Sequence, residues 1–96
     1  MTYSILLSPR ARRALDDDLP EAVAAACAEF IFGALAENPH RVGKPLRDEL
    51  EGAYSARRGE FRVIYTIHAH RVVDRVISIR HRRNLYSLRD RPETTA

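Results

Sequence analysis

The spacing of the apolar residues changes near the middle of the chain, and this change constrains the fold more than any other feature. Between residues 19 and 35 they recur every three or four positions, as on one face of an amphipathic helix: Leu19, Val23, Ala26, Cys27, Phe30, Ile31, Ala34 and Leu35. From residue 53 onward they alternate with polar residues, which is typical of half-buried strands. Helices followed by strands predict an α+β fold.

The first part of the chain is expected to form a short strand over residues 2–8 and then two helices. Ser8-Pro9 indicates the start of the first helix, because serine caps helix N-termini and proline is tolerated in the first turn. Asp18, with Glu21 three residues later, resembles a capping box and predicts the start of the second helix. Asn38-Pro39 is expected to end it.

The second half of the chain is expected to form three consecutive strands. Their ranges are residues 53–57, 60–67 and 72–80, with tight turns at Arg58-Gly59 and at residues 69–71. In the second strand, alternation directs one set of side chains to the core: Phe61, Val63, Tyr65 and Ile67. In the third strand, the residues predicted to face the core are Val73, Ile77 and Ile79.

The predicted order of elements is therefore β-α-α-β-β-β. It implies a small antiparallel sheet with a helical pair on one face and the other face exposed. Residues 39–52 would connect the helices to the sheet, with a short helical turn near Asp48. We expect residues 1–88 to form a single domain, because the chain has the usual size of one domain. Residues 89–96 are polar and are expected to be a flexible tail.

Basic residues are unevenly distributed along the chain. Residues 1–48 carry six basic and seven acidic side chains, whereas residues 49–96 carry ten basic and six acidic ones. Fifteen of the sixteen basic residues are arginine, which binds phosphate through two parallel hydrogen bonds and stacks on bases. A nucleic-acid partner is compatible with this composition, although GC-rich coding also produces an excess of arginine.

The single cysteine and the lack of long apolar runs indicate the cellular compartment. Cys27 has no second cysteine to pair with, and its place on the apolar face of the second predicted helix predicts a core position. A reducing cytosol suits such a chain. No run approaches the roughly 18 apolar residues of a membrane span. We therefore expect a cytoplasmic protein with no membrane partner.

Arginines concentrate in three segments that the predicted strands bring together. These are Arg57-Arg58 where the first of these strands meets its turn, the strand residue Arg62, and residues 80–83 at the end of the last strand. In an antiparallel pair the end of one strand lies beside the start of the other, so Arg82 is expected near Arg62. The guanidinium groups would converge on the exposed face of the sheet, where a phosphodiester would neutralise them.

Simpler interpretations stand beside these. Arg58 lies in a hairpin turn and is readily explained as a solvated side chain, and residues 80–83 are also explained as an exposed strand end. His81 by itself is more typical of an ordinary surface histidine. The His68-Ala69-His70 spacing resembles a metal-ligand pair, but it falls in a turn with no acidic ligand, so neither a metal ion nor another cofactor is expected.

Two longer runs and one loop resemble a known toxin family. The run Tyr54–Tyr65 is similar to the central hairpin of RelE-type toxins, and Ile77–Tyr86 resembles the last strand and C-terminal signature of that family. Asn38-Pro39 followed by Gly43–Leu46 resembles its inter-element loop. By this resemblance the chain is identified as a member of the RelE/ParE superfamily, the toxins of bacterial type II toxin–antitoxin systems.

The resemblance implies roles for individual residues in cutting RNA. Arg62 matches the arginine that contacts the scissile phosphate, and Arg82 matches the one that stabilises charge or protonates the leaving oxygen. Tyr86 matches the aromatic residue that stacks on the substrate nucleotide. The residues expected to extend the RNA-binding surface are Lys44, Arg57, Arg58, Arg80 and Arg83.

One departure from the family pattern concerns the general base. RelE has two lysines in the first strand of this hairpin, whereas this chain has Ser55 and Arg57 at those positions, and its turn is shorter. Arginine stays protonated and is a poor base. The hypothesis is that His81 transfers the proton, with Lys44 as a second candidate.

The resemblance leaves alternative activities. RelE-branch toxins are endoribonucleases that bind in the ribosomal A site and cut mRNA there. The partners would then be the bacterial ribosome, mRNA and a RelB-like antitoxin, with operator DNA bound only through the antitoxin complex. A ParE-like toxin would instead poison DNA gyrase without cutting RNA, and a degenerate member would act only as a DNA-binding corepressor. The presence of all the matched RNA-site residues together favours the ribonuclease.

Overall fold

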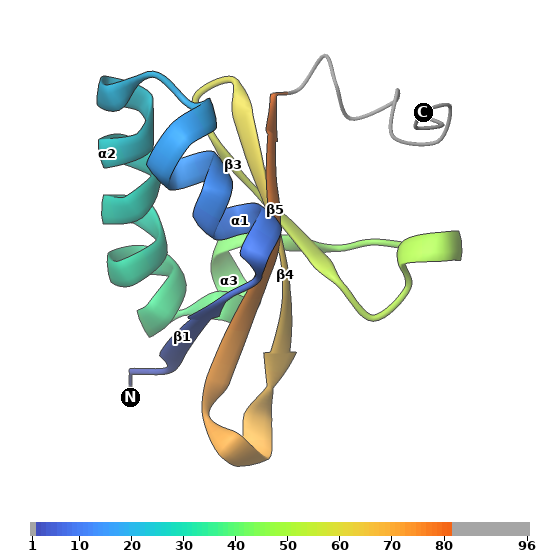
Figure 1. Cartoon of the computed structure of the whole chain (residues 1–96). Helices are drawn as coiled ribbons and strands as arrows, with labels where there is room; N and C mark the ends of the chain where they lie inside the picture. The colour runs from blue at the N-terminus through green and yellow to red at the C-terminus, as the bar shows by residue number, and fades with distance from the viewer. Residues whose placement is uncertain (1, 82–96) are drawn as a thin grey trace.

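The computed structural model describes residues 2–81, which form a five-stranded sheet with helices on one face (Figure 1). The strands are β1 (Ser4–Leu7), β2 (Lys44–Pro45), β3 (Tyr54–Arg58), β4 (Phe61–His68) and β5 (Val73–His81). The helices are α1 (Pro9–Arg13), α2 (Glu21–Phe30) and α3 (Pro39–Val42). Shorter turns are the π-helical η1 (Ala14–Asp18) and η2 (Ile31–Leu35) and the 3-10 turns η3 (Asp48–Leu50) and η4 (Ala69–Arg71). The α+β class is confirmed.

The sheet is mixed rather than antiparallel, which corrects the expectation from the sequence. Its strand order is β1-β5-β4-β3-β2. β1 runs parallel to β5, and every other neighbouring pair is antiparallel. The helices carry the chain from β1 to the opposite edge of the sheet, so the strands that follow return toward β1 and the last of them pairs with it in the same direction.

The start of the first helix is confirmed in detail. Ser8 has an extended backbone, and its hydroxyl accepts a hydrogen bond from the Ala11 amide at 3.0 Å. The same hydroxyl donates a hydrogen bond to the carbonyl of Ile77, and Pro9 occupies the first turn. One side chain therefore caps α1 and ties it to β5.

The start of the second helix differs from the predicted capping box. Asp18 is the last residue of η1, where the Leu19 amide donates to the Ala14 carbonyl at 2.9 Å. α2 begins at Glu21, with Pro20 in the cap position and no side-chain cap. The wider π turn holds Asp18 inside the first helical segment, so its carboxylate does not cap the second.

The second π turn, η2, follows α2 directly and shifts the buried face of this helical segment. Cys27 and Ile31 are buried as expected. Within η2 the wider turn moves the apolar face by one position, so that Leu35 and Ala36 are buried. Ala34, predicted to face the core, is exposed.

A β-bulge between β4 and β5 inverts the predicted faces of β5 up to Ile77 and leaves those after it unchanged. Ile64 pairs with Ser78 and Tyr65 pairs with Val76, so Ile77 has no residue opposite it. The bulge places Val76 and Ile79 on the same face, and both belong to the core.

The predicted inward set of β5 is therefore wrong for two of its three members. Ile79 is confirmed as a core residue. Val73 and Ile77 are only partly buried and lie outside the core cluster, because the extra residue changes which positions face the helices. Before the bulge, Asp74 faces the helices instead and is fully buried.

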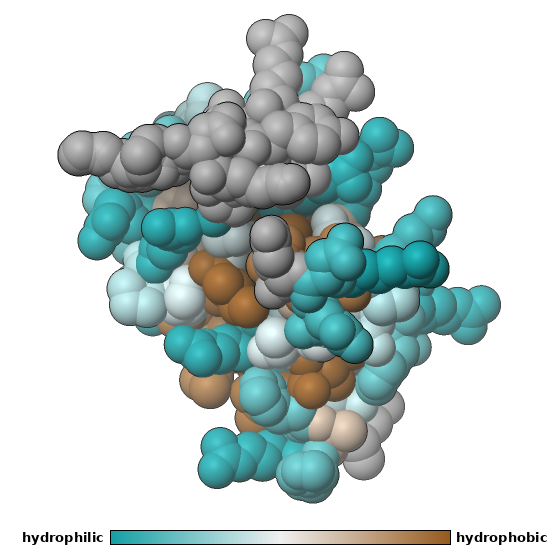
Figure 2. Space-filling model, turned by 90° about the vertical axis from the view of Figure 1, so that its right-hand side faces the viewer, coloured by the Kyte–Doolittle hydropathy of each residue, from teal (hydrophilic) through white to brown (hydrophobic). Residues whose placement is uncertain are grey.

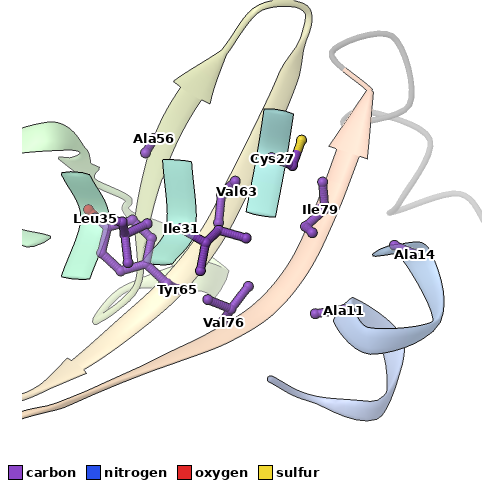
Figure 3. Packing of buried hydrophobic residues seen from close by; sticks show 10 residues of the cluster. All are labelled: Ala11, Ala14, Cys27, Ile31, Leu35, Ala56, Val63, Tyr65, Val76 and Ile79. Carbon is purple, nitrogen blue, oxygen red and sulfur yellow. The ribbon is translucent and has the colours of Figure 1, made fainter. Parts of the chain in front are cut away.

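The core lies between the helices and the sheet (Figure 3). Tyr65 is fully buried there, and its hydroxyl donates a hydrogen bond to the carbonyl of Pro39 at the start of α3. Its ring stacks on Tyr54 with the centroids 5.7 Å apart. α3 and β2, which the sequence did not predict, are thus anchored to the sheet. None of the helices within residues 2–81 is long and apolar enough to cross a membrane.

Gly43 allows β2 to approach the Tyr65 ring. A Cβ atom at this position would collide with the Tyr65 hydroxyl and would lie 3.1 Å from the backbone oxygen of Ser55. The absence of a side chain therefore keeps the hydrogen bond to Pro39 intact while β2 pairs with β3.

Gly43→Ala should lower the free energy of unfolding by roughly 1–3 kcal/mol, because the added Cβ displaces the Tyr65 hydroxyl from its hydrogen bond. Gly33→Ala is the matched control. Nothing lies within 4 Å of its added Cβ, so stability should rise by about 0.5–1 kcal/mol, since alanine favours a helix more than glycine does. Urea denaturation measures both changes, and equal effects would contradict the close approach at Gly43.

Asp74 is a buried carboxylic acid on the helix side of β5. It lies opposite Ile5 of β1 and Ile67 of β4, and within residues 2–81 neither carboxylate oxygen has a hydrogen-bond partner. Burial raises the pKa of Asp74 to about 6, because the charged form is poorly solvated there. In the unfolded chain the pKa is about 3.9. The folded state therefore gains stability from this group at low pH and loses it as the pH rises from about 4 to 6.

Asp74→Asn should remove this pH dependence. Between about pH 4 and about pH 7, the free energy of unfolding of wild type should fall by on the order of 2 kcal/mol relative to that of the variant. Urea denaturation of both proteins at the two pH values measures the difference. A difference that stays constant with pH would show that Asp74 does not titrate in this range.

Candidate functional site

Three arginines stand side by side across three neighbouring strands. Arg57 on β3 pairs with Arg62 on β4, and Arg62 pairs in turn with Arg80 on β5. Paired residues of adjacent strands point to the same face, with their Cβ atoms about 5 Å apart. These three residues are called the arginine row below.

The arginine row lies on the face of the sheet away from the helices, called the open face below. The chain neighbours Ala56, Val63 and Ile79 all belong to the helix-covered core, and side chains alternate between the two faces along a strand. Figure 2 looks onto the open face, where hydrophilic side chains surround smaller apolar areas.

The arginine row brings like charges close together. Directly opposed like charges destabilise a sheet. Arg80 Nε donates to the Ser78 hydroxyl at 3.2 Å, whereas Nε of Arg62 is buried with no hydrogen-bond partner within residues 2–81. The strands offer no acidic side chain to this face, since Asp74, the acidic residue among β1–β5, is buried on the helix side. An anion bound to the row would therefore offset the repulsion between its guanidinium groups.

A second row lies beside the first, two residues along the strands. Its members, which the strand pairing aligns, are Lys44 on β2, Ser55 on β3, Ile64 on β4 and Ser78 on β5. Lys44 is exposed at the edge of the sheet, while Ile64 and Ser78 are buried. The Oγ atom of Ser55 is buried and lacks a hydrogen-bond partner among the described residues. The two rows together thus combine three guanidinium groups, one amine and two hydroxyl groups.

His81 and Arg58 lie on the opposite face from the arginine row. His81 pairs with Phe61, which packs against the core, and the two rings meet edge to face with centroids 5.1 Å apart. His81 Nε2 also lies 3.2 Å from Oε1 of Glu60. Arg58 also pairs with Phe61. Burial raises the pKa of the Cys27 thiol in the core, and the positive charge of Arg58 partly offsets this increase. The structure therefore separates both residues from Arg62.

Three other residues predicted for the site lie outside residues 2–81, the range that the structure describes: Arg82, Arg83 and Tyr86. Within that range no group of three or more histidine, cysteine, aspartate or glutamate side chains is arranged to hold a metal ion. In the histidine pair of the β4–β5 hairpin, His68 Nε2 lies 3.2 Å from Oγ1 of Thr66.

Sequence patterns did not reveal two features of the open face. Arg75, which pairs with Thr66, reaches this face because of the bulge, and Ile77 is an ordinary strand residue that gives no signal of it. The pairing of Lys44 with Ser55 depends on a two-residue strand inside a segment with the composition of a loop. Neither feature is encoded in an alternation that a sequence pattern could detect.

Comparison with known proteins agrees with this architecture. Residues 5–86 match the family described as the ParE toxin of the type II toxin–antitoxin system, parDE. The chain belongs to the RelE/ParE toxin superfamily. Two curated toxins of Mycobacterium tuberculosis are similar to it. Toxin RelE is 57% identical over 65 residues, covering 68% of this chain and 66% of that protein, just under two thirds. Toxin RelG is 43% identical over 86 residues, covering 90% of this chain and 98% of that protein.

Solved structures resemble this toxin as well. A chain of the toxin–antitoxin complex RelBE2 from Mycobacterium tuberculosis matches with a TM-score of 0.81 and 42% identity, over 84% of this toxin and 92% of that chain. A chain of the intact Escherichia coli RelBE complex matches with a TM-score of 0.69 and 21% identity, over 82% of this toxin and 95% of that chain. The second likeness shows the shared fold alone.

Inorganic phosphate should stabilise this toxin more than chloride does at equal ionic strength, because the arginine row binds the anion. At ten times its dissociation constant, one bound anion raises the free energy of unfolding by about 1.4 kcal/mol. Arg62→Ala should lose this increment, whereas Arg71→Ala, in η4 at the far end of the β4–β5 hairpin, should keep it. Thermal unfolding in the two salts measures the effect. The same phosphate effect in all three proteins would contradict binding at the row.

Proposed function

We propose that this toxin is a ribosome-dependent endoribonuclease that cuts mRNA in the ribosomal A site through attack of the 2′-hydroxyl. The observation that carries the proposal is the arginine row, at whose centre the Nε of Arg62 is buried without a partner within residues 2–81. The names of the two curated relatives, Toxin RelE and Toxin RelG, support the RelE branch of the superfamily.

The chemistry of RNA cleavage matches such a row. RNA carries its own nucleophile, so the protein has to align the 2′-oxygen with phosphorus and stabilise the charge on the pentavalent phosphate. Guanidinium groups fit the non-bridging oxygens through paired hydrogen bonds. Arg62 would bind the scissile phosphate, with Arg57 and Arg80 on either side of it. These cations supply positive charge, so the proposal requires no metal ion from the toxin.

The C-terminal residues complete the proposal through the resemblance to RelE toxins. Arg82 would stabilise the developing charge or protonate the leaving oxygen, Tyr86 would stack on a base, and Arg83 would bind the RNA backbone. Arg58, on the other face of the sheet, would contact RNA or ribosome only outside the cleavage site.

A RelB-like antitoxin is the proposed partner that controls the activity. The RelBE2 match is a toxin–antitoxin complex. An acidic or amphipathic antitoxin segment laid over the arginine row would neutralise its charge and block RNA at the same time. Operator DNA would be bound only through the pair. The toxin would act on ribosomes and mRNA in the cytoplasm, with no membrane partner.

A second candidate function follows from the description of the matching family, which names the ParE toxin of the parDE system. A ParE-like toxin would poison DNA gyrase and leave RNA intact. Such a poison has no need of three guanidinium groups arranged to fit a phosphodiester. Arg62 is therefore the residue that distinguishes the two functions.

Arg62→Ala should slow mRNA cleavage by roughly 100- to 1,000-fold, the usual effect of removing one group that stabilises a charged transition state. Primer extension on an mRNA translated in a purified bacterial system locates the cuts and measures their rate. Arg71→Ala, which removes an arginine from η4, should cut like wild type. Cuts should fall within codons and require ribosomes.

Intact mRNA with the wild-type toxin would refute the ribonuclease. If the same preparation then inhibited supercoiling by DNA gyrase, the second candidate would take its place. Equal cleavage by Arg62→Ala and wild type would leave a ribonuclease whose active site lies away from the arginine row.

A further inference from the structure

The arginine row can bind a phosphate, but it cannot accept the proton of the 2′-hydroxyl. Guanidinium groups stay protonated in proteins. Ser55 and Ser78 carry hydroxyl groups, which are no stronger as bases than the ribose hydroxyl itself. Among the described strands, the carboxylate of Asp74 is buried on the helix side. The proton acceptor must therefore be another group that reaches the open face.

The histidines of the strands are not placed to serve. His81 lies on the opposite face, against Phe61 and 3.2 Å from Glu60. His68 shares the open face by alternation, but it is the last residue of β4 whereas Arg62 is the second. At roughly 3.3 Å per residue, the two lie about 20 Å apart along the strand.

Lys44 is the one amine that the described strands place on the open face. It pairs with Ser55, so the two side chains point to the same side of the sheet. Its α-carbon lies two strands across and two residues along from that of Arg62, a separation of about 12 Å. Lysine and arginine are long enough for both to reach one nucleotide across this distance.

The backbone around Lys44 is held on both sides. After it, the Leu46 amide donates to the carbonyl of Ala53 at 2.9 Å. Before it, the Tyr65 hydroxyl binds the carbonyl of Pro39, and Gly43 allows the close approach. These contacts fix where the lysine side chain starts, while the side chain itself remains exposed to a substrate.

We propose that Lys44 is a catalytic residue that accepts the proton of the 2′-hydroxyl, an inference that rests on the proposed ribonuclease function. The hydroxyl gives its proton to the neutral ε-amine as its oxygen bonds to phosphorus. The bond from phosphorus to the 5′-oxygen breaks, and the leaving oxygen takes a proton from water. The products are a 2′,3′-cyclic phosphate and a 5′-hydroxyl.

Lys44→Arg separates proton transfer from charge, because arginine keeps the positive charge and cannot act as the base. Single-turnover cleavage of mRNA on programmed ribosomes should fall by roughly 100- to 10,000-fold. Co-sedimentation of the variant with ribosomes should match that of wild type. Added methylamine should restore part of the rate in Lys44→Ala and none in Arg62→Ala. Arg71→Ala serves as the control with wild-type cleavage.

Cleavage by Lys44→Arg at the wild-type rate would overturn the assignment. Loss of ribosome association in parallel with loss of cleavage would also overturn it, because Lys44 would then only bind, and so would failure of methylamine to restore any cleavage in Lys44→Ala. A loss in His81→Gln with none in Lys44→Arg would return the role to His81. An inactive wild type would refute the ribonuclease function itself, which separates that failure from failure of the Lys44 assignment.

Discussion

Ile77 of β5 has no residue opposite it on β4, and this β-bulge decides which β5 side chains face the helices and which lie on the open face. Because Ile77 has no partner, Val76 and Ile79 face the helices together, and Arg80 turns to the open face beside Arg62. Without this bulge, strict alternation would put Val76 and Arg80 on the same face, so β5 could not contribute Val76 to the core and Arg80 to the row together. β-Bulges often redirect side chains next to functional sites. Here the same extra residue builds the core on one face and the cationic row on the other.

Two further contacts join the core to the open face. Tyr65 is buried under the helices, yet its hydroxyl holds the connection that leads into β2, and Gly43 leaves the space for it. β2 in turn places Lys44 beside Ser55 at the edge of the open face. Packing on the helix side therefore positions an exposed amine on the opposite side. A small domain has few core residues, and here Tyr65 both fills the core and fixes the segment that leads into β2.

The class of the fold and most of its elements could be predicted from the sequence, because they depend on local periodicity and on local caps such as Ser8. The arginines at positions 57 and 62 could also be placed on one face, because a tight turn at Gly59 fixes their register. Features set by a single extra residue could not be predicted. The π turn at residues 31–35 and the bulge at Ile77 each shift a periodic pattern by one position and leave no mark in residue type. The hypothesis that His81 transfers the proton did not use the alternation along β5, which places His81 on the same face as Ile79, against Phe61 and away from Arg62.

The most direct test of this account is a cryo-electron microscopy structure of the toxin on a ribosome whose A-site nucleotide carries a 2′-O-methyl group, which prevents cleavage. The account predicts that the open face meets the mRNA. The Arg62 guanidinium should lie within about 3.2 Å of a scissile-phosphate oxygen, and the Lys44 amine should stand beside the 2′-oxygen. An mRNA held against α2, or a scissile phosphate away from the arginine row, would contradict it.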